Sequence, residues 1–420
     1  MSNLSFILAN LTRRLWLRAA LFSVLSVATT IFAFAIDPLV AHYLSLQIPR
    51  AATETMLNIL ASSMLAVTTF SLSTMISGFS AATSNVTPRA TPLVTEDRTA
   101  QNAISIFLGS FLFGVTSLVL MNLGVFGEKG SFALFVVTVV IMLWIVVTFL
   151  HWMDHLAALV RVDVTTARVE RACLDAFAKW LKHPHFGGRP TEEWEPAQGF
   201  AVTGAAQGYV QHVDVGIIEA VAARNDTVIR LIVVPGSYVH SRMMVMESRD
   251  ALDDGEMERL VEALTIADRR HFSNDPRFGM IVLAEVASRA LSPAINDPGT
   301  AIAALAAGTR LLANWIEVSS EKVTSEPLHP HVYAPGLNAD DLFDDLIRPI
   351  ARDGAGLLEV AIRLQKMLGV LALAGDGAHA ALARKHADAA LERSLEALSL
   401  PEDKALLQEV ARDAVPKTVP

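Results

Sequence analysis

The chain has 420 residues, of which 52% are hydrophobic and 18% charged, a balance too apolar for an ordinary soluble protein. The formal net charge is −9 and no basic tract is present, which argues against a nucleic-acid partner. The single cysteine, Cys173, excludes intrachain disulfides and a cysteine-based zinc site.

The first predicted membrane span is an apolar run at residues 19–36, which follows a group of arginines. The run is about long enough to cross the roughly 30 Å hydrocarbon core of a bilayer. The tripeptide Ala33-Phe34-Ala35 also resembles the cleavage site of a signal peptide. We favour a retained span, because the run is longer than a typical signal-peptide core, and cleavage stays an alternative.

The second span, predicted at residues 55–80, belongs to a longer uncharged run between Glu54 and Arg89. As one helix, residues 55–87 would extend about 50 Å. Small and hydroxylated side chains recur every three or four residues, and this spacing places them on one helical face. They are Ser62, Ala66, Thr69, Ser73, Ser77, Ser80, Ser84 and Thr87.

This face has two interpretations. Small and hydroxylated residues are the usual contacts between packed membrane helices, and a hydroxyl can bond back to its own helix. Alternatively, the face lines a pore or polar pathway in an oligomer, with Leu60, Leu65, Phe70 and Met75 on the opposite sides.

Two further apolar spans are predicted at residues 103–126 and 131–152. In the last span, Trp144 suits burial and Trp152 suits the aromatic belt at a membrane surface. Close helix packing is expected at the glycines of the third span, Gly109, Gly114 and Gly124.

The arginines near these spans predict the orientation of the chain. Most fall on one side, at positions such as Arg18, Arg98 and Arg161, whereas the other side has Arg50 and Lys129. By the positive-inside rule, both termini and the chain beyond residue 153 are expected in the cytoplasm.

Beyond the spans, residues 154–197 are predicted to form a connecting helix and loop, residues 198–250 a small β-containing module, and residues 251–415 a helical domain. The helical domain includes amphipathic patterns at Glu256–His271 and Phe278–Leu291. The predicted fold class is therefore an α-helical integral membrane protein, with four transmembrane helices and residues 1–153 as its membrane domain. A cytoplasmic mixed α/β domain follows.

The motif RALSPAINDPGTA, Arg289 to Ala301, closely resembles the signature of a bacterial membrane-protein family, domain of unknown function 2254. Thr87-Pro88-Arg89 is similar to that family's Ser-Pro-Arg after its second span. Further matching positions are Asp97, Arg98, Gln101, Leu108, Gly109 and Phe111. One departure is that the family's second span has a glutamine, which residues Ser77 to Ala81 of this chain lack. The resemblance implies a multi-pass protein of the bacterial inner membrane and no established activity.

Histidines supply the candidate metal ligands. His151, Asp154 and His155 lie at i, i+3 and i+4, a spacing that suits a divalent metal or a proton relay, although a polar cap on a membrane helix is the plainer interpretation. The loop pairs His183/His185 and His329/His331 have no neighbouring cysteines. We expect no enzyme and no cofactor, because nucleotide-binding, hydrolase and metalloprotease motifs are missing from the sequence.

The signature loop, Ser292, Pro293, Asn296, Asp297 and Pro298, is predicted to cap a helix, with Asp297 as the capping residue. A rigid loop of this kind could also contact a ligand or another subunit. An ion-pair network of Glu285, Arg289 and Asp275 around the motif would be explained by stability alone.

Two carboxylates are predicted at the outer ends of the first two spans. Asp37 and Glu54 could ring a pore mouth and attract cations, or they could be ordinary helix-end charges.

The function favoured by the sequence is an oligomeric channel for small ions. Its second span would line the pore, and its cytoplasmic domain would gate or assemble it. The alternative is a non-conducting membrane scaffold or sensor whose cytoplasmic domain binds a partner. In both cases the expected partners are the lipid bilayer and further copies of the chain. A proton-coupled carrier is disfavoured, because it usually needs an intramembrane acid or histidine.

Overall fold

The computed structural model describes residues 15–43, 49–95, 97–124, 131–159, 161–195, 199–204, 206–320, 326–375 and 377–414. The chain divides into two compact units, an N-terminal unit that ends at Val164 and a C-terminal unit that begins at Thr165. Each unit has its own hydrophobic core.

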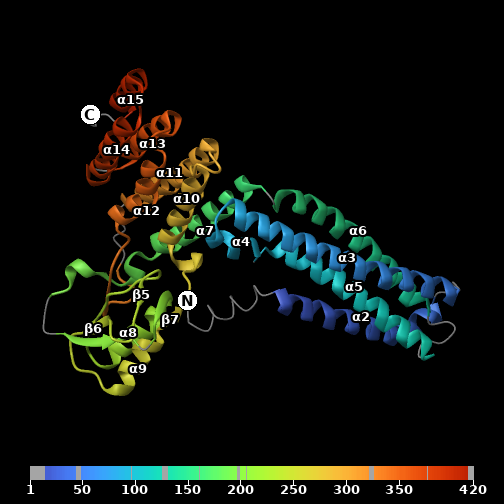
Figure 1. Cartoon of the computed structure of the whole chain (residues 1–420). Helices are drawn as coiled ribbons and strands as arrows, with labels where there is room; N and C mark the ends of the chain where they lie inside the picture. The colour runs from blue at the N-terminus through green and yellow to red at the C-terminus, as the bar shows by residue number, and fades with distance from the viewer. Residues whose placement is uncertain are drawn as a thin grey trace. The chain divides into compact units, whose positions relative to one another are not determined.

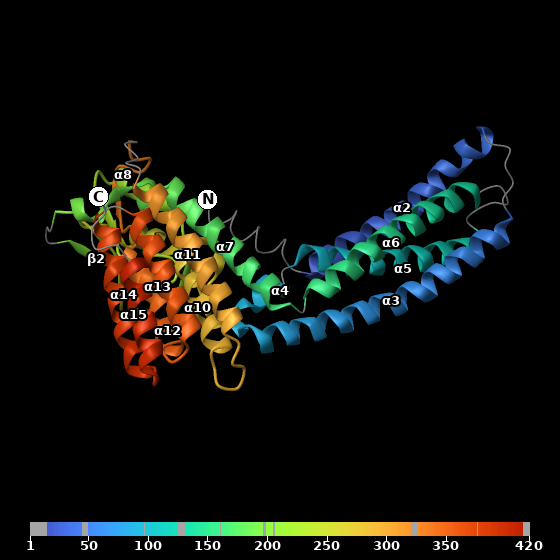
Figure 2. The same cartoon turned by 90° about the horizontal axis from the view of Figure 1, so that it is seen from above.

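The N-terminal unit is built from long helices that run side by side (Figures 1 and 2). Helices α5 and α6 each contact both α2 and α3, and α5 also contacts α6. A short helix η1 and a single-turn helix α4 connect α3 to α5. The bounds are α2 Leu15–Tyr43, α3 Arg50–Asn85, η1 Pro88–Ala90, α4 Thr91–Thr95, α5 Arg98–Asn122 and α6 Ser131–Leu159.

These helices extend past the predicted spans. Helix α2 continues through Asp37 and Pro38 to Tyr43, and α6 continues past Trp152 to Leu159. The predicted spans cover only the apolar runs of the sequence. A helix can continue into polar residues as long as its backbone hydrogen bonds are kept, so α2 and α6 are longer than their spans. Residues 125–130, which include the connection between the third and fourth predicted spans, lie outside the described residues.

Glycines allow α5 to approach its neighbours closely, as expected. A Cβ atom on Gly114 would lie 3.1–3.3 Å from the Cβ, N and Cα atoms of Ala61 on α3, and one on Gly109 would lie 2.9 Å from Ser26 Oγ on α2. Gly124 has a different role. It follows α5 with φ of +72° and would meet no neighbour within 4 Å, so it suits the left-handed backbone at the helix end.

The C-terminal unit begins with α7 (Val162–Lys182), whose residues from Thr165 onward belong to this unit, followed by a module of short strands. Strands β1, β8, β4, β6 and β2 form one sheet in that order, and β5, β3 and β7 form another. The strands are β1 Arg189–Pro190, β2 Phe200–Thr203, β3 Gly208–Val213, β4 Ile229–Leu231, β5 Tyr238–Val239, β6 Met244–Ser248, β7 Leu264–Ala267 and β8 Val332–Ala334. Helices α8 (Val215–Arg224) and α9 (Asp254–Glu262) accompany them.

Two strands come from the stretch predicted to be helical. The expected helix at Glu256–His271 is wrong in its second half, because α9 ends at Glu262 and Leu264–Ala267 forms β7. Strand β8 lies at residues 332–334 and pairs in parallel with β4. The local apolar spacing fitted a helix, but pairing with β3 provides the backbone hydrogen bonds of β7 instead.

The rest of the C-terminal unit is a helical bundle, in agreement with the sequence analysis. Helix α10 contacts α11 and α12, α13 contacts α11, α14 and α15, and α14 contacts α12 and α15 (Figure 2). Their bounds are α10 Pro276–Ala290, α11 Pro298–Ser320, α12 Ala339–Asp353, α13 Leu358–Ala374, α14 Gly377–Ala397 and α15 Pro401–Ala414, and the short helices η2 Pro184–Gly187, η3 Thr191–Glu193 and η4 Phe272–Asn274 lie outside it.

Five helices of the described residues are long and apolar enough to cross a membrane: α2, α3, α5, α6 and α11. Sequence analysis predicted the first four. Helix α11 belongs to the C-terminal unit, where it packs against α10, α12 and α13 and fully buries Leu305, Leu312 and Ile316. Burial in a helical bundle explains its apolar character without a membrane.

Candidate functional site

Helix α3 has two chemically different faces. One packs on the rest of the N-terminal unit and buries Leu57, Leu60, Met64 and Met75, together with the hydroxyl of Ser71. At 100° per residue, these positions lie on the side opposite to Ser62, Thr69, Ser73, Ser77 and Ser80. The latter five residues, which we call the hydroxyl face, are all exposed in the chain.

Among the described residues, nothing packs closely enough on the hydroxyl face to bury it. Ser62 Oγ donates to Asn58 O at 2.7 Å, and Thr69 Oγ1 donates to Ala66 O at 2.9 Å. Such bonds to the helix's own backbone reduce the cost of placing a hydroxyl in an apolar surrounding. The face is therefore available to lipid, water or another copy of the chain.

The polar face of α3 differs from the predicted one at both ends. Thr55 and Asn58 are exposed and lie on the same side of α3, about two turns and one turn before Ser62, so the polar face begins earlier than expected. The successive spacings, three residues from Thr55 to Asn58 and four from Asn58 to Ser62, were a usable signal. Thr87 does not belong to the face, since it is buried and caps η1 by accepting a hydrogen bond from Arg89 N at 3.3 Å. The side chain of Ser84 lies outside the described residues.

Large apolar side chains border the hydroxyl face. Leu65, Phe70 and Ile76 are 48%, 66% and 58% exposed. The sequence analysis placed Leu65 and Phe70 on the sides opposite to the hydroxyl face, whereas in the structure they are exposed and border it. Helix α3 therefore presents a hydroxyl strip with apolar borders, an arrangement that suits contact between subunits on either side of a polar lining.

The predicted pore mouth is described only in part. Glu54 lies half-buried in the first turns of α3, and the side chain of Asp37 lies outside the described residues. Nearby, Arg50 Nη2 donates a hydrogen bond to Met121 O at the end of α5. A basic group thus shares this end of the helices with Glu54.

His151, Asp154 and His155 do not converge on a metal site. His151 is exposed and its Nδ1 lies 2.9 Å from Val147 O, while Asp154 is also exposed. His155 instead faces Asp97, with 2.9 Å between His155 Nε2 and Asp97 Oδ2. Within the described parts of the chain, no group of three histidine, cysteine, aspartate or glutamate side chains could hold a metal ion.

Asp97 joins two helices of the N-terminal unit. Its Oδ1 accepts hydrogen bonds from Thr99 N at 2.8 Å and Ala100 N at 3.2 Å, which caps α5, while Oδ2 meets His155 on α6. Asp97 and Gln101 are two of the positions that carried the family resemblance. Gln101 is buried and its Nε2 donates to Thr95 O at 3.0 Å. These positions therefore hold the connection from α3 to α5.

The tryptophans of α6 are arranged in the reverse of the expectation. Trp152 is 1% exposed and its Nε1 donates to Ser71 Oγ at 3.1 Å, whereas Trp144 is 50% exposed. A buried indole needs a hydrogen-bond acceptor, and Ser71 provides it. The pairing links residues 81 positions apart, so it could not be seen from local sequence.

The histidine pairs of the loops are also held separately. His185 Nδ1 lies 2.8 Å from Ala334 O, and His331 Nδ1 lies 2.7 Å from Glu219 Oε1. The rings of His185 and His331 are therefore each held by a separate contact.

The signature loop caps α11, as predicted. Asp297 accepts hydrogen bonds from Thr300 N at 3.1 Å and from Thr300 Oγ1 at 2.6 Å, and these bonds lower the pKa of Asp297. Asn296 has φ of +50°, a left-handed backbone that asparagine tolerates. Pro293 and Asn296 are exposed, and Ile295 is 44% exposed. The loop thus presents an apolar tip held by a capped helix.

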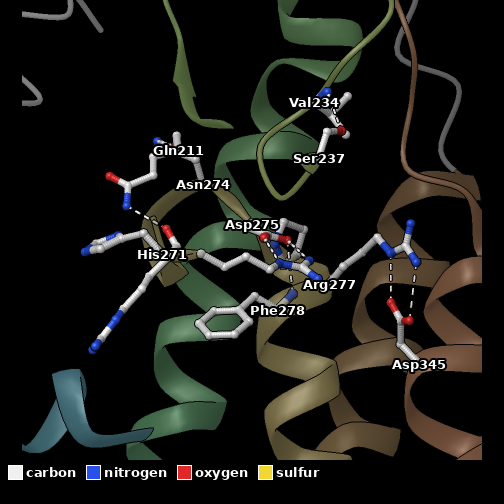
Figure 3. Close-up of polar contacts among 12 residues, drawn as sticks. Gln211, Val234, Ser237, His271, Asn274, Asp275, Arg277, Phe278 and Asp345 are labelled. Carbon is white, nitrogen blue, oxygen red and sulfur yellow. Dashed lines mark hydrogen bonds and ion pairs between the residues drawn. The ribbon is translucent and has the colours of Figure 1, made fainter. Parts of the chain in front are cut away.

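An ion-pair cluster that includes the buried carboxylate of Asp275 lies at the start of α10 (Figure 3). Asp275, 2% exposed, meets Arg270 through two contacts of 2.7 and 2.9 Å and also accepts a hydrogen bond from Phe278 N at 3.0 Å. Next to it, Arg277 donates to Asp341 at 2.6 Å and to Asp345 at 2.8 Å on α12. We call these five charged residues the arginine cluster.

The cluster joins the strand module to the bundle. A Cβ atom on Gly236, in the turn before β5, would lie 2.4 Å from Asp275 Oδ2, so only glycine fits there. Asn274 O accepts from Trp180 Nε1 on α7 at 3.0 Å, and Asn274 Nδ2 donates to Gln211 O on β3 at 3.2 Å. Burial raises the pKa of the Asp275 carboxyl, and the Arg270 guanidinium opposes that shift.

The expected network of Glu285, Arg289 and Asp275 is therefore wrong, because Asp275 is too far from Arg289 to pair with it. Asp275 precedes α10 and Arg289 lies at its end, so the two are separated by almost the whole helix, roughly 20 Å. Arg270 was not proposed as a partner, because it lies in a stretch that had been assigned to a helix and now follows β7.

The one cysteine is chemically quiet. Cys173 is fully buried on α7, and its Sγ donates to Pro276 O at 3.3 Å. Burial raises the pKa of the Cys173 thiol far above its usual range. Since the thiolate is the reactive form, Cys173 is expected to be inert to thiol reagents.

Comparison with known proteins identifies the family of the chain, and the names of the relatives state no activity. An uncharacterized protein of Mycobacterium bovis and one of Mycobacterium tuberculosis strain H37Rv are each 28% identical over 181 residues. Each alignment covers 41% of this chain and 33% of the relative, so the match spans about a third of the relatives' length. No solved structure matches the chain. The family model "Predicted membrane protein (DUF2254)" matches residues 12–369, and the chain belongs to this family.

Proposed function

We propose that the protein is an oligomeric channel for small ions, with the hydroxyl face of α3 lining the pore. The observation that carries the proposal is the position of this face, which lies opposite to the side of α3 buried by α5 and α6. A pore between subunits needs a polar surface directed away from each subunit's own core. We propose further that the chain lies in the bacterial inner membrane with both termini in the cytoplasm, and that it has no enzymatic activity.

The borders of the hydroxyl face support this arrangement. Phe70 and Ile76 are exposed beside the serines. In an oligomer, they would pack against the neighbouring subunit while the narrow hydroxyl strip faces water. Hydroxyl groups can replace part of the hydration shell of an ion without the cost of burying a charge.

A scaffold or sensor is the second candidate. The exposed tip of the signature loop, with Ile295 projecting from a capped turn, suits contact with a protein partner. In a scaffold, the hydroxyl face would be a dry contact between copies of α3.

Water access to the hydroxyl face distinguishes the two functions. In the Ser73→Cys variant, reconstituted in liposomes, we expect modification by a membrane-impermeant thiosulfonate at rates within about tenfold of those for an exposed thiol. The matched control is Val140→Cys, on the exposed apolar side of α6, which is expected to stay unmodified in lipid. Cys173 need not be removed, since it is buried with a raised pKa.

Either of two results would count against the channel. Ser73→Cys and Val140→Cys could be equally protected in protein shown to be assembled, which would favour the dry contact. Equal modification of both would mean that the whole surface is open to the reagent.

A further inference from the structure

The two sheets of the strand module end at a common groove. Strand β2 is the last strand of one sheet and pairs with β6, and β7 is the last strand of the other and pairs with β3. Residues of β2, β7 and α9 line a groove of about 510 Å³ between them. Helix α9 contacts both strands (Figure 1 shows it beside β7).

The floor of this edge groove is apolar and its charged residues are acidic. Met257, Val261 and Ile266, all half-buried, contribute the apolar surface. The charged lining residues are Glu258 and Glu262 of α9, and no lysine or arginine lines the groove within the described residues. An occupant would therefore be favoured if it were apolar on one side and basic on the other.

Strand β2 offers backbone groups as well as this surface. In an edge strand, alternate residues direct their N–H and C=O groups away from the one neighbouring strand. An extended segment can pair with those groups, and its alternate side chains then enter the adjacent surface. Because β2 spans Phe200–Thr203, such a segment would add only a few backbone hydrogen bonds. Side-chain contacts in the groove would then supply the rest of the affinity and the specificity.

We infer that the edge groove docks an extended basic segment of a partner protein as an additional strand beside β2. Apolar residues of the segment would lie over Met257 and Val261, and its lysines or arginines would face Glu258 and Glu262. This inference concerns the C-terminal unit alone and does not depend on ion conduction.

The test measures fluorescence anisotropy of a labelled nine-residue peptide in which valine alternates with lysine. It is titrated with the full chain in a neutral detergent. We expect saturable binding with a Kd of about 1–100 μM, typical of a small interface. Replacing lysine by glutamate in the peptide, or inserting two central prolines, is expected to weaken binding at least about tenfold, because these changes remove charge attraction or strand pairing.

Variants of the chain locate the binding. Ala206→Trp, which fills the groove, and Glu258→Lys/Glu262→Lys, which reverses its charge, should each raise Kd at least about tenfold. The control Glu192→Lys/Glu193→Lys reverses two exposed carboxylates on η3 and should change Kd less than about twofold. Melting temperatures establish that the variants are folded.

Several results would overturn the inference. These are absence of binding, equal binding of the proline peptide, or Ala206→Trp and the charge reversal leaving Kd unchanged. A change in subunit number in Ala206→Trp, without peptide binding by the original chain, would assign the groove to contact between copies instead.

Discussion

Replacing Asp275 with alanine is expected to lower the free energy of unfolding by about 3–5 kcal/mol, the cost of breaking a buried ion pair. The substitution leaves Arg270, 19% exposed, without its carboxylate, and also removes the acceptor for Phe278 N at the start of α10. The loss is large because the Arg270 charge, which stays mostly shielded from water, then has no buried carboxylate to compensate it. The intact pair need not contribute a similar amount, since burying Asp275 has its own desolvation cost.

Urea denaturation of the full chain in detergent, followed by tryptophan fluorescence, measures this effect. Trp180 reports on it directly, since its indole donates to Asn274 O beside the cluster. The control is Asp340→Ala, whose partner Lys385 is 3.4 Å away and whose pair is exposed. It should cost less than about 1 kcal/mol. If the two variants unfolded at the same urea concentration, the arginine cluster would not be a structural centre.

Replacing Ser73 or Ser77 with leucine is expected to reduce ion flux at least about tenfold, because an apolar ring narrows and dewets a pore. Both residues lie on the hydroxyl face and away from the core of their own chain, so the fold of each subunit should persist. Flux is measured as potassium release from liposomes, and chemical crosslinking counts the subunits of each variant.

The matched control is Thr29→Leu on α2. Thr29 Oγ1 donates to Leu25 O at 2.8 Å, the same kind of bond to its own helix that Ser62 makes. Replacing Thr29 with leucine should leave the ion flux within about twofold of that of the original chain, since Thr29 is not on α3. Loss of assembly in Ser73→Leu and Ser77→Leu, with no flux from the original protein, would identify the hydroxyl face as a packing surface.

The long apolar helices of the N-terminal unit were predictable because apolar length is a local property. The run of residues 19–36 and the uncharged run after Glu54 specify α2 and α3 without knowledge of their neighbours. The hydroxyl face follows from spacing alone. The spacing does not show which sides of α3 are buried, because Leu65 and Phe70 are as apolar as Leu57. Leu57 is buried and the other two are exposed because α5 and α6 contact only one side of α3.

The errors have a common cause in long-range pairing. Leu264–Ala267 forms a strand because it pairs with β3. The local apolar spacing gives no information about that partner strand. His155 looked like a metal ligand beside His151, yet its neighbour is Asp97, from another helix. Trp152 was expected at a membrane surface, and Ser71 allows it to be buried.

Capping was the most predictable part of the candidate sites. Asp297 accepts both hydrogen bonds of Thr300, as the order of aspartate, proline and glycine indicated. The edge groove could not be predicted, since β2 and β7 are separated by about sixty residues and become its two borders only after both sheets form.

The central claim is that ions pass along the hydroxyl face of α3. Its most direct test is potassium flux through the Ser73→Cys variant in liposomes, before and after a membrane-impermeant thiosulfonate is added. We predict flux above that of empty liposomes, which the reagent stops in Ser73→Cys but leaves unchanged in the original chain and in Val140→Cys. The absence of flux from assembled protein under any voltage, pH or osmotic gradient would contradict the claim. Flux through Ser73→Cys that the reagent leaves unaltered would contradict it too.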